Sequence, residues 1–441
     1  MILMKKSILL ILALFFTSIN YGQNYYLSTP EGYGQATTGG GNVTPVTVST
    51  YSDFKAKIKL STPQVILVSG TIIIASGQNI SEIVTNKTII GLPGARLVNN
   101  SQTQSGSGIL NLKNGSNNVI IRNLIFEGAG AYDVDGRDNL TANGCTNLWV
   151  DHCEFQDGVD GNFDIKGNSD NITVSWCKFT YLKPAVPGGP GGSNDHRFSN
   201  LVGSSDSQAP ADGHYSVTFQ NCYWAEGCKE RMPRARNSQL HILNCYYNTN
   251  VSSSRALGFS GGLNNLSCYV ENSDFANIGT VYQSYGGTVT LEFDNCINGV
   301  SNIGTVPQPT YTYSVIPISD VSTNIPNVNC GAGATLQVTS SGEMSSSCDN
   351  LGIEDAIFSK VKYYPTIVKD ALSIEFSLEN YYEAKFSLYT VHGKNIMNKS
   401  ISTQNTPNNK TIIDLSQYTK GIYFVKLQIQ NNTKTFKIIK K

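Results

Sequence analysis

The chain has 441 residues with 32 basic and 32 acidic side chains, so its formal net charge is zero. This length allows one large domain and a smaller one, and the charge balance gives no reason to expect a nucleic-acid partner. Only 15% of residues are charged, Gly, Asn, Ser and Thr are abundant, and no long stretch has a 3.6-residue apolar period, which predicts an all-β protein and excludes a mainly helical one.

The N-terminus has the pattern of an export signal. Lys5 and Lys6 form a basic segment, Ile8 to Phe16 form an apolar core, and cleavage is expected near Gly22. The apolar run is too short for a membrane span, and no other candidate span follows it. We therefore predict a signal peptide at residues 1–22 and an exported protein.

Short related segments recur along the middle of the chain. Their central Cys or Ser positions are 24, 45, 23, 28 and 23 residues apart, and the segments are Asp151–Phe155, Ser175–Phe179, Gln220–Trp224, Leu243–Tyr247, Glu271–Phe275 and Phe293–Ile297. Such a period with short strands and polar turns is typical of a solenoid, here a right-handed parallel β-helix over residues 23–330. The cysteines would then stack as buried thiols, and the neighbouring asparagines would form a hydrogen-bonded ladder.

The ends of the repeat region differ from its middle. Ser52 to Leu60 is a short amphipathic stretch that could cap the open N-terminal coil. After Asn302 the repeat fades into a Pro/Thr/Tyr stretch and then a Ser/Gly-rich one, which we interpret as a closing excursion and a linker at residues 331–359. Cys330 and Cys348 flank this short segment, and we expect them to form a disulfide.

The last part, residues 360–441, has its own composition, with 13 Lys, no Arg and 5 acidic residues, while the remainder carries a net charge of −8. Alternating runs predict a small antiparallel β-sandwich. The segment resembles the C-terminal sorting domains of type IX secretion cargo, through Tyr364-Pro365, Val391–Lys394, Asp414–Ser416, Lys420–Tyr423 and Lys437–Lys441. The resemblance implies a type IX secretion machinery as partner and a secreted, extracellular protein, either released or held on the cell surface.

The stretch Glu230–Arg236 places three arginines, Arg231, Arg234 and Arg236, within six residues. The guanidinium group is a rigid fork of donors that suits carboxylates. Some 70 residues upstream, Asp160–Asp164 carries two acids suited to a cation. Together these elements suggest chemistry on an acidic polymer with the help of a metal.

Several motifs in residues 30–310 together resemble the pectate lyases of polysaccharide lyase family 1. They are Glu31–Gly34 with Gly39–Gly41, Val119–Leu124, Leu148–His152, Asp160–Ile165, and Arg231–Arg236 followed by His241. The resemblance implies β-elimination on polygalacturonate, in which the proton at C5 is removed and the C4 oxygen leaves. Because the adjacent carboxylate is already charged, a hard cation and arginines around it would lower the barrier.

The same resemblance implies roles for individual residues. Asp138, Asp160 and Asp164 would bind Ca²⁺, and Arg236 would clamp the substrate carboxylate. Arg231 would be the catalytic residue, either as the base or as the group that stabilises the enolate while another group takes the proton. Arg234 is expected to be structural.

Two positions depart from the family pattern. The lysine that commonly binds substrate is missing from the segment Asp195–Gly203, where Arg197 is our preferred replacement and Lys183 the alternative. Asn237-Ser238 stands after Arg236, where an aromatic residue and a glycine are usual.

Two other functions stay open. A pectin lyase would act on methylated substrate without Ca²⁺, but retention of the three acids argues against it. A non-catalytic β-helical glycan-binding surface protein would have the same fold. Such a protein would have no need for Arg231 together with the three acids. We expect a monomer.

Overall fold

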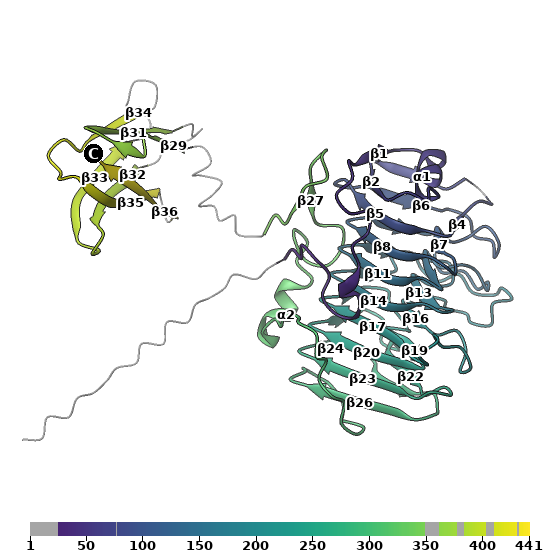
Figure 1. Cartoon of the computed structure of the whole chain (residues 1–441). Helices are drawn as coiled ribbons and strands as arrows, with labels where there is room; N and C mark the ends of the chain where they lie inside the picture. Colours follow the sequence, from purple (N-terminus) through teal and green to yellow (C-terminus); the bar gives the residue numbers. More distant parts are fainter. Residues whose placement is uncertain (1–24, 76, 349–360, 377–382, 403–409, 430–431) are drawn as a thin grey trace, which may run out of the picture.

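The computed structural model describes residues 25–75, 77–348, 361–376, 383–402, 410–429 and 432–441 (Figure 1). The predicted signal peptide, residues 1–22, lies outside this part. No helix among the described residues is long and apolar enough to cross a membrane.

Residues 46–294 wind into a solenoid of three parallel sheets, in which strands of successive coils lie side by side (Figure 1). The predicted parallel β-helix is therefore confirmed. A ten-stranded sheet contains, in order, β1 (Val46–Val48), β2 (Gln64–Val68), β5 (Thr85–Gly91), β8 (Asn117–Arg122), β11 (Thr146–Asp151), β14 (Asp170–Ser175), β17 (Tyr215–Gln220), β20 (Ser238–Leu243), β23 (Leu266–Glu271) and β26 (Val289–Asp294).

Two eight-stranded sheets complete each coil. The first, called the site sheet below, contains β4 (Ile80–Glu82), β7 (Leu110–Leu112), β10 (Leu140–Asn143), β13 (Phe163–Lys166), β16 (Leu201–Val202), β19 (Arg234–Arg236), β22 (Arg255–Ser260) and β25 (Thr280–Ser284). The second contains β3 (Thr71–Ile73), β6 (Arg96–Val98), β9 (Ile125–Glu127), β12 (Glu154–Gln156), β15 (Lys178–Thr180), β18 (Tyr223–Trp224), β21 (Tyr246–Asn248) and β24 (Asp274–Asn277).

Because equivalent positions of successive coils are in register, like side chains stack inside the solenoid. Aromatic rings follow one another down the core, with centroids 4.3–5.5 Å apart, in the row Phe126, Phe155, Phe179, Trp224, Tyr247 and Phe275. The asparagine ladder is present in parts. Asn244 donates to the side chain of Asn221 at 2.9 Å, and Asn295 donates to that of Asn272 at 2.8 Å.

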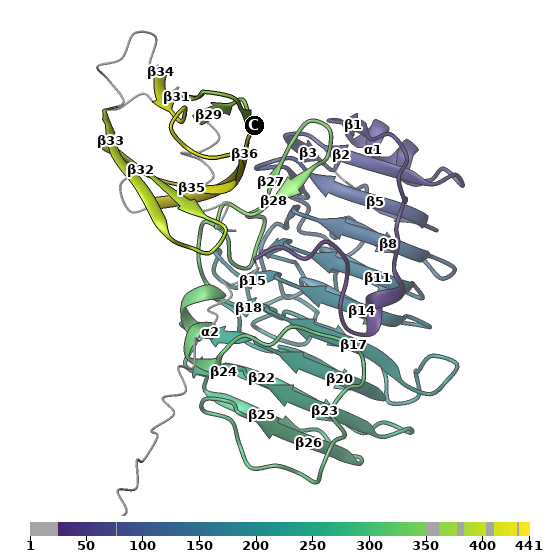
Figure 2. The same ribbon diagram turned by 60° about the vertical axis from the view of Figure 1, so that its left-hand side comes forward.

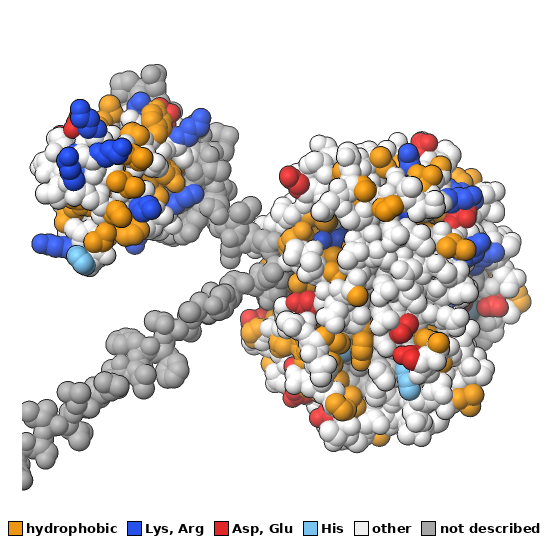
Figure 3. All heavy atoms as spheres, in the orientation of Figure 1, with side chains coloured by type: hydrophobic (Ala, Val, Ile, Leu, Met, Phe, Trp, Pro, Cys, Tyr) orange, Lys and Arg blue, Asp and Glu red, His pale blue; other side chains and the backbone are white. Residues whose placement is uncertain are grey.

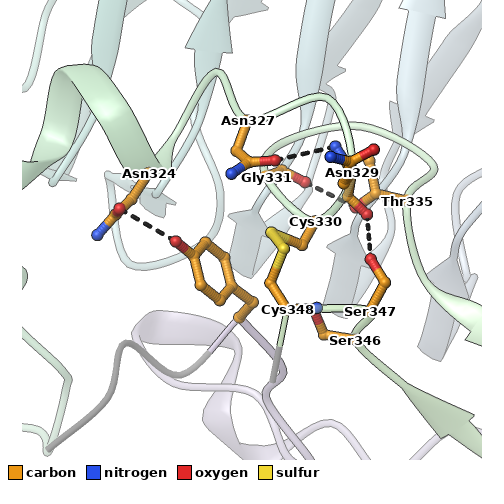
Figure 4. Close-up of a disulfide and its surroundings, with 10 residues drawn as sticks. Asn324, Asn327, Asn329, Cys330, Gly331, Thr335, Ser346, Ser347 and Cys348 are labelled. Atoms are coloured by element: carbon orange, nitrogen blue, oxygen red, sulfur yellow. Dashed lines mark hydrogen bonds between the residues drawn. A yellow bond between two sulfur atoms is a disulfide. The ribbon is translucent and has the colours of Figure 1, made fainter. Parts of the chain in front are cut away.

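The repeat cysteines are free thiols, and all but Cys296 are buried, as the stacking model predicted. The one disulfide among the described residues joins Cys330 to Cys348, which confirms the expected pairing (Figure 4). Between these cysteines, Leu336 and Val338 pack on Val65 and Leu67 of the ten-stranded sheet. This part of the predicted linker is therefore attached to the solenoid wall, while residues 349–360 lie outside the described part.

Short helices and extended segments cover the solenoid (Figure 2). The expected N-terminal cap is α1 (Tyr51–Ile58), which buries Phe54 and Ile58 completely. The segment that precedes it contains η1 (Tyr33–Ala36) and runs over the ten-stranded sheet, where Gly34 donates its backbone N–H to Thr173 at 2.9 Å. The C-terminal excursion contains α2 (Ile318–Asn324), β27 (Gln337–Val338) and β28 (Met344–Ser345).

The C-terminal residues form two further sheets around a core of their own, as the predicted sandwich requires. Basic side chains are scattered over the visible surface of this domain among hydrophobic ones, whereas the visible face of the solenoid is sparsely charged (Figure 3). Its strands are β29 (Val361–Tyr364), β30 (Ile367–Val368), β31 (Ala371–Phe376), β32 (Glu383–Thr390), β33 (Asn395–Ser402), β34 (Lys410–Asp414), β35 (Gly421–Ile429) and β36 (Asn432–Lys440).

Candidate active site

The candidate residues gather on the outer face of the site sheet. On β13, Asp164 and Lys166 flank the buried Ile165, so both point away from the core. On β19, Arg234 and Arg236 flank the buried Ala235 in the same way. A single strand, β16, separates β13 from β19, and its Leu201 is in register with Arg234. The acids and the arginines therefore share one face.

Asp138 reaches this face from the coil before Asp164. It precedes β10, whose Thr141 is in register with Asp164 and donates to Oδ2 of Asp138 at 3.0 Å. A Cβ added to Gly161 would lie 2.8 Å from Oδ1 of Asp138 and 3.4 Å from Oδ1 of Asp164. Both carboxylates therefore lie close to Gly161, and a larger residue there would require the Asp138 side chain to shift. Oδ1 of Asp138 is buried and has no hydrogen-bond partner in the described part of the chain.

Burial makes the charge of this acidic pair costly. Burial first, and then the neighbouring Asp138, raise the pKa of Asp164 to about 8. Lys166 is the nearby counter-ion, with its Nζ 3.3 Å from Oδ2 of Asp138 and 3.6 Å from Oδ2 of Asp164. Burial alone would lower the pKa of Lys166, but the two carboxylates outweigh it and raise that pKa. The pair thus holds a cationic group already.

Asp160, the third predicted ligand, faces a different partner. Its Oδ1 lies 3.0 Å from Nδ1 of His196, and Nε2 of the same imidazole lies 3.4 Å from Asp133. The charge of Asp160 still acts on Asp164 and contributes to the raised pKa. Over the described residues, no group of three or more His, Cys, Asp or Glu side chains is placed to hold a metal ion. The structure brings Asp138 and Asp164 together and leaves Asp160 at their side.

Even so, the pair fits a hard cation. Two buried carboxylates converge on one glycine, one of their oxygens lacks a partner, and their mutual repulsion is relieved by positive charge. Oxygen ligands of this kind are those that Ca²⁺ accepts.

Arg231 lies where the chain turns into β19. Its backbone is in the left-handed region, with φ of 62°, and its carbonyl accepts the N–H of Asn200 at 2.6 Å. Its guanidinium lies over the ring of Phe198, with Cζ 4.0 Å from the ring centroid. Arg231 has no side-chain hydrogen bond or ion pair among the described residues. Its positive charge acts to lower the pKa of Asp164, against the larger effect of burial.

Arg234 and Arg236 are both half-buried, and burial lowers the pKa of each. Arg236 donates to the carbonyl of Gly203 at 2.7 Å, and its Nε lies 3.2 Å from the exposed Asp206. Arg234 lies over the ring of Tyr285 at 3.8 Å, and its buried Nε has no hydrogen-bond partner in the described chain.

The two candidates for the substrate lysine are engaged elsewhere. Arg197 makes a two-pronged contact with Asp195 at 2.8 and 2.7 Å. The ammonium of Lys183 donates to the carbonyl of Gly128 at 2.9 Å, next to the second eight-stranded sheet. Neither contact involves the acidic pair or Arg231.

Sequence reasoning overlooked Lys166, His196 and Phe198. A signal was available for Lys166, because a residue two positions after Asp164 on a strand shares its face. The contacts of His196 and Phe198 depend on how residues 184–200 return to the solenoid, which no spacing in the sequence reveals.

The fold places the protein among parallel β-helix proteins. Its candidate site combines the acidic pair, Asp138 and Asp164, with Arg234 and Arg236 on the same sheet. A family model described as pectate lyase matches residues 27–333, and the chain belongs to that family. A solved pectate lyase variant from Bacillus subtilis covers 71% of this chain and 98% of its own, with a TM-score of 0.54 and 20% identity, which shows the shared fold.

Curated relatives match different shares of the chain. A pectate trisaccharide-lyase of Thermotoga maritima is 36% identical over 226 residues, covering 49% of this chain and 53% of that protein. A probable pectate lyase A of Aspergillus niger is 30% identical over 314 residues, covering 68% of this chain and 85% of that one. The chain thus spans about half the length of the Thermotoga relative.

A second family model, described as a secretion system C-terminal sorting domain, matches residues 362–441. This match confirms the predicted sorting domain and marks the protein as secreted.

Proposed function

We propose that the protein is a secreted, Ca²⁺-dependent pectate lyase that cleaves α-1,4-polygalacturonate by β-elimination and releases unsaturated oligogalacturonides. Membership of the pectate lyase family and the names of its relatives support the reaction class. The observation that carries the proposal is the approach of Asp138 and Asp164 on the outer face of the site sheet, which also carries Arg234 and Arg236, with the charge of Arg231 acting on Asp164. A site of this kind joins a cation-binding pair to a donor for a carboxylate or enolate.

Asp138 and Asp164 are the residues that would hold the Ca²⁺, and Asp160 would complete the set if its carboxylate left His196. The bound cation would withdraw charge from the substrate carboxylate and so make the C5 proton more acidic. Lys166 now neutralises the pair and would lie next to the cation and the substrate.

The arginines would act on the substrate itself. Arg236 would present its guanidinium to a sugar carboxylate, while Gly203 and Asp206 hold one side of the group. Arg231 keeps its in-plane donors free of protein partners among the described residues, so it can contact the reacting sugar and stabilise the enolate. To take the C5 proton as the base, its guanidinium would first have to give up a proton to solvent. Arg197 and Lys183 would reach the substrate only after releasing Asp195 and Gly128.

The other partners follow from the C-terminal domain. The sorting domain supports a type IX secretion machinery as partner, and we propose that the enzyme works as a monomer. Residues 23–330 form the lyase domain in this proposal, residues 331–359 the connection, and residues 360–441 the sorting domain.

The test is an ultraviolet assay for the conjugated double bond of the product. The full chain is incubated with polygalacturonate in Ca²⁺ and then in excess chelator, and methylated pectin serves as the second substrate. Product in Ca²⁺ that disappears with chelator supports the proposal. Activity that survives the chelator and prefers methylated pectin would indicate a pectin lyase, and absence of product in every condition would leave a glycan-binding protein.

A further inference from the structure

The contact between Phe198 and Arg231 sets this arginine apart from Arg197 and Arg236, which have carboxylate partners. Arg197 is paired with Asp195, and Arg236 lies against Asp206. Arg231 instead lies over an aromatic face, with Cζ 4.0 Å from the ring centroid of Phe198. The three arginines are therefore oriented by two different kinds of partner.

The difference has chemical consequences. A carboxylate partner occupies the in-plane N–H donors of a guanidinium, and the hydrogen bonds that Arg197 donates to Asp195 raise the pKa of Arg197. A ring attracts the flat face of the cation and leaves all the in-plane donors available. An aromatic partner can thus fix a guanidinium without using the groups that a substrate carboxylate needs.

Phe198 is held firmly enough to serve as such a platform. Its side chain is only 6% exposed, and its backbone pairs with Glu230, the residue before Arg231. Its carbonyl accepts the hydroxyl of Tyr181 and the N–H of Asn162, two residues before Asp164. The backbone of Phe198 is therefore fixed between the coil of Asp164 and the coil of Arg231, and burial restricts its ring.

We propose that Phe198 is a positioning residue for the reaction, which holds the guanidinium of Arg231 by its face so that the donors point to the substrate. The inference rests on the proposed lyase function. Phe198 lies in the segment Asp195–Gly203, where the family resemblance led us to look for a substrate lysine. In this chain the segment supports Arg231 through a ring rather than supplying a cation of its own.

The experiment compares Phe198→Leu with Phe198→Tyr in the full-length protein on polygalacturonate. Leucine removes the π face, and kcat should fall by about tenfold, within the range of a partly buried cation–π contact, with less than about a twofold change in KM. Tyrosine keeps the ring and should restore kcat to within about threefold of the starting protein. Tyr285→Leu, which removes the ring beneath Arg234, is the matched control and should leave kcat within about twofold.

A double-mutant cycle with Arg231→Lys separates positioning from general damage. If Phe198 acts through Arg231, Phe198→Leu has no further effect on the residual rate of Arg231→Lys. Additive losses, an unchanged kcat in Phe198→Leu, or a Tyr variant as slow as the Leu variant would each overturn the inference. If Phe198→Leu does not fold, as judged by tryptophan fluorescence, Phe198→Met replaces it. An inactive starting protein would refute the proposed function instead.

Discussion

The ammonium of Lys166 lies 3.3 Å from Oδ2 of Asp138, which belongs to the preceding coil of the solenoid. The same ammonium lies 3.6 Å from Asp164, so one lysine neutralises the carboxylate pair that we assign to Ca²⁺. A cation that enters this pair must therefore share its ligands with a fixed positive charge or displace it.

Lys166→Met should tighten Ca²⁺ binding. The substitution keeps an unbranched side chain of similar length but removes the charge that repels the incoming cation, so we expect Kd to fall by about three- to tenfold. Calorimetric titration of the chain with CaCl₂ measures it. Lys113→Met, on an exposed side chain outside the acidic cluster, is the matched control. An unchanged or weaker affinity in Lys166→Met would show that the lysine does not compete for the pair.

Asp138→Asn should raise the Ca²⁺ concentration needed for half-maximal activity by at least about tenfold. The amide keeps the size of the carboxylate and one oxygen but loses the negative charge that lies close to Gly161 and Asp164. The rate of product formation is measured over a range of Ca²⁺ concentrations. Asp135→Asn changes an exposed acid three residues away and should leave the curve in place. If the two variants had the same dependence of activity on Ca²⁺ concentration, Asp138 would not be a Ca²⁺ ligand.

Arg231→Lys should reduce kcat by at least about a hundredfold, because lysine keeps the charge but lacks the planar fork of donors. Ca²⁺ affinity, measured by calorimetry, should change by less than about threefold, since Arg231 does not touch the acids directly. Arg234→Lys, three residues further along on β19, is the comparison and should retain most of kcat. A mild effect of Arg231→Lys would refute its assignment as the catalytic residue.

The lowered pKa of Asp151 predicts how the stability of the solenoid depends on pH. Burial alone would raise its pKa, but His152 and Arg122 outweigh burial and lower it to about 2. A carboxylate whose pKa is lower in the folded protein stabilises the fold at pH values above its pKa in the unfolded chain, about 3.9. This stabilisation is lost as the pH falls toward the pKa of the folded protein. The shift corresponds to about 2 kcal/mol of unfolding free energy.

Asp151→Asn should therefore be less stable than the parent protein at neutral pH. The difference between their free energies of unfolding should decrease by about 2 kcal/mol as the pH falls from about 4 to about 2. Urea unfolding followed by tryptophan fluorescence measures this difference. All three tryptophans, Trp149, Trp176 and Trp224, are buried in the solenoid, so the signal reports on this domain. A difference that stays constant over this pH range would contradict the assignment.

The sequence alone was sufficient for the fold. Repeated Asn-Cys segments at similar spacing require equivalent positions to stack, and stacking buries the cysteines and aligns rings such as Phe155 and Phe179. The charge difference between the two parts of the chain indicated a second domain. These features are local or periodic, and a repeat turns local patterns into tertiary structure.

The arrangement within the site could be decided only by the tertiary structure. The sequence proposed Asp138, Asp160, Asp164 and Arg231, but it could not show that Asp160 faces His196 or that Lys166 lies between the other two acids. It also could not show Phe198 beneath Arg231, 33 residues later in the chain. These contacts depend on the length and path of the loops between coils. A repeat pattern specifies the register of the strands, but it does not specify where the loops that leave them place their side chains.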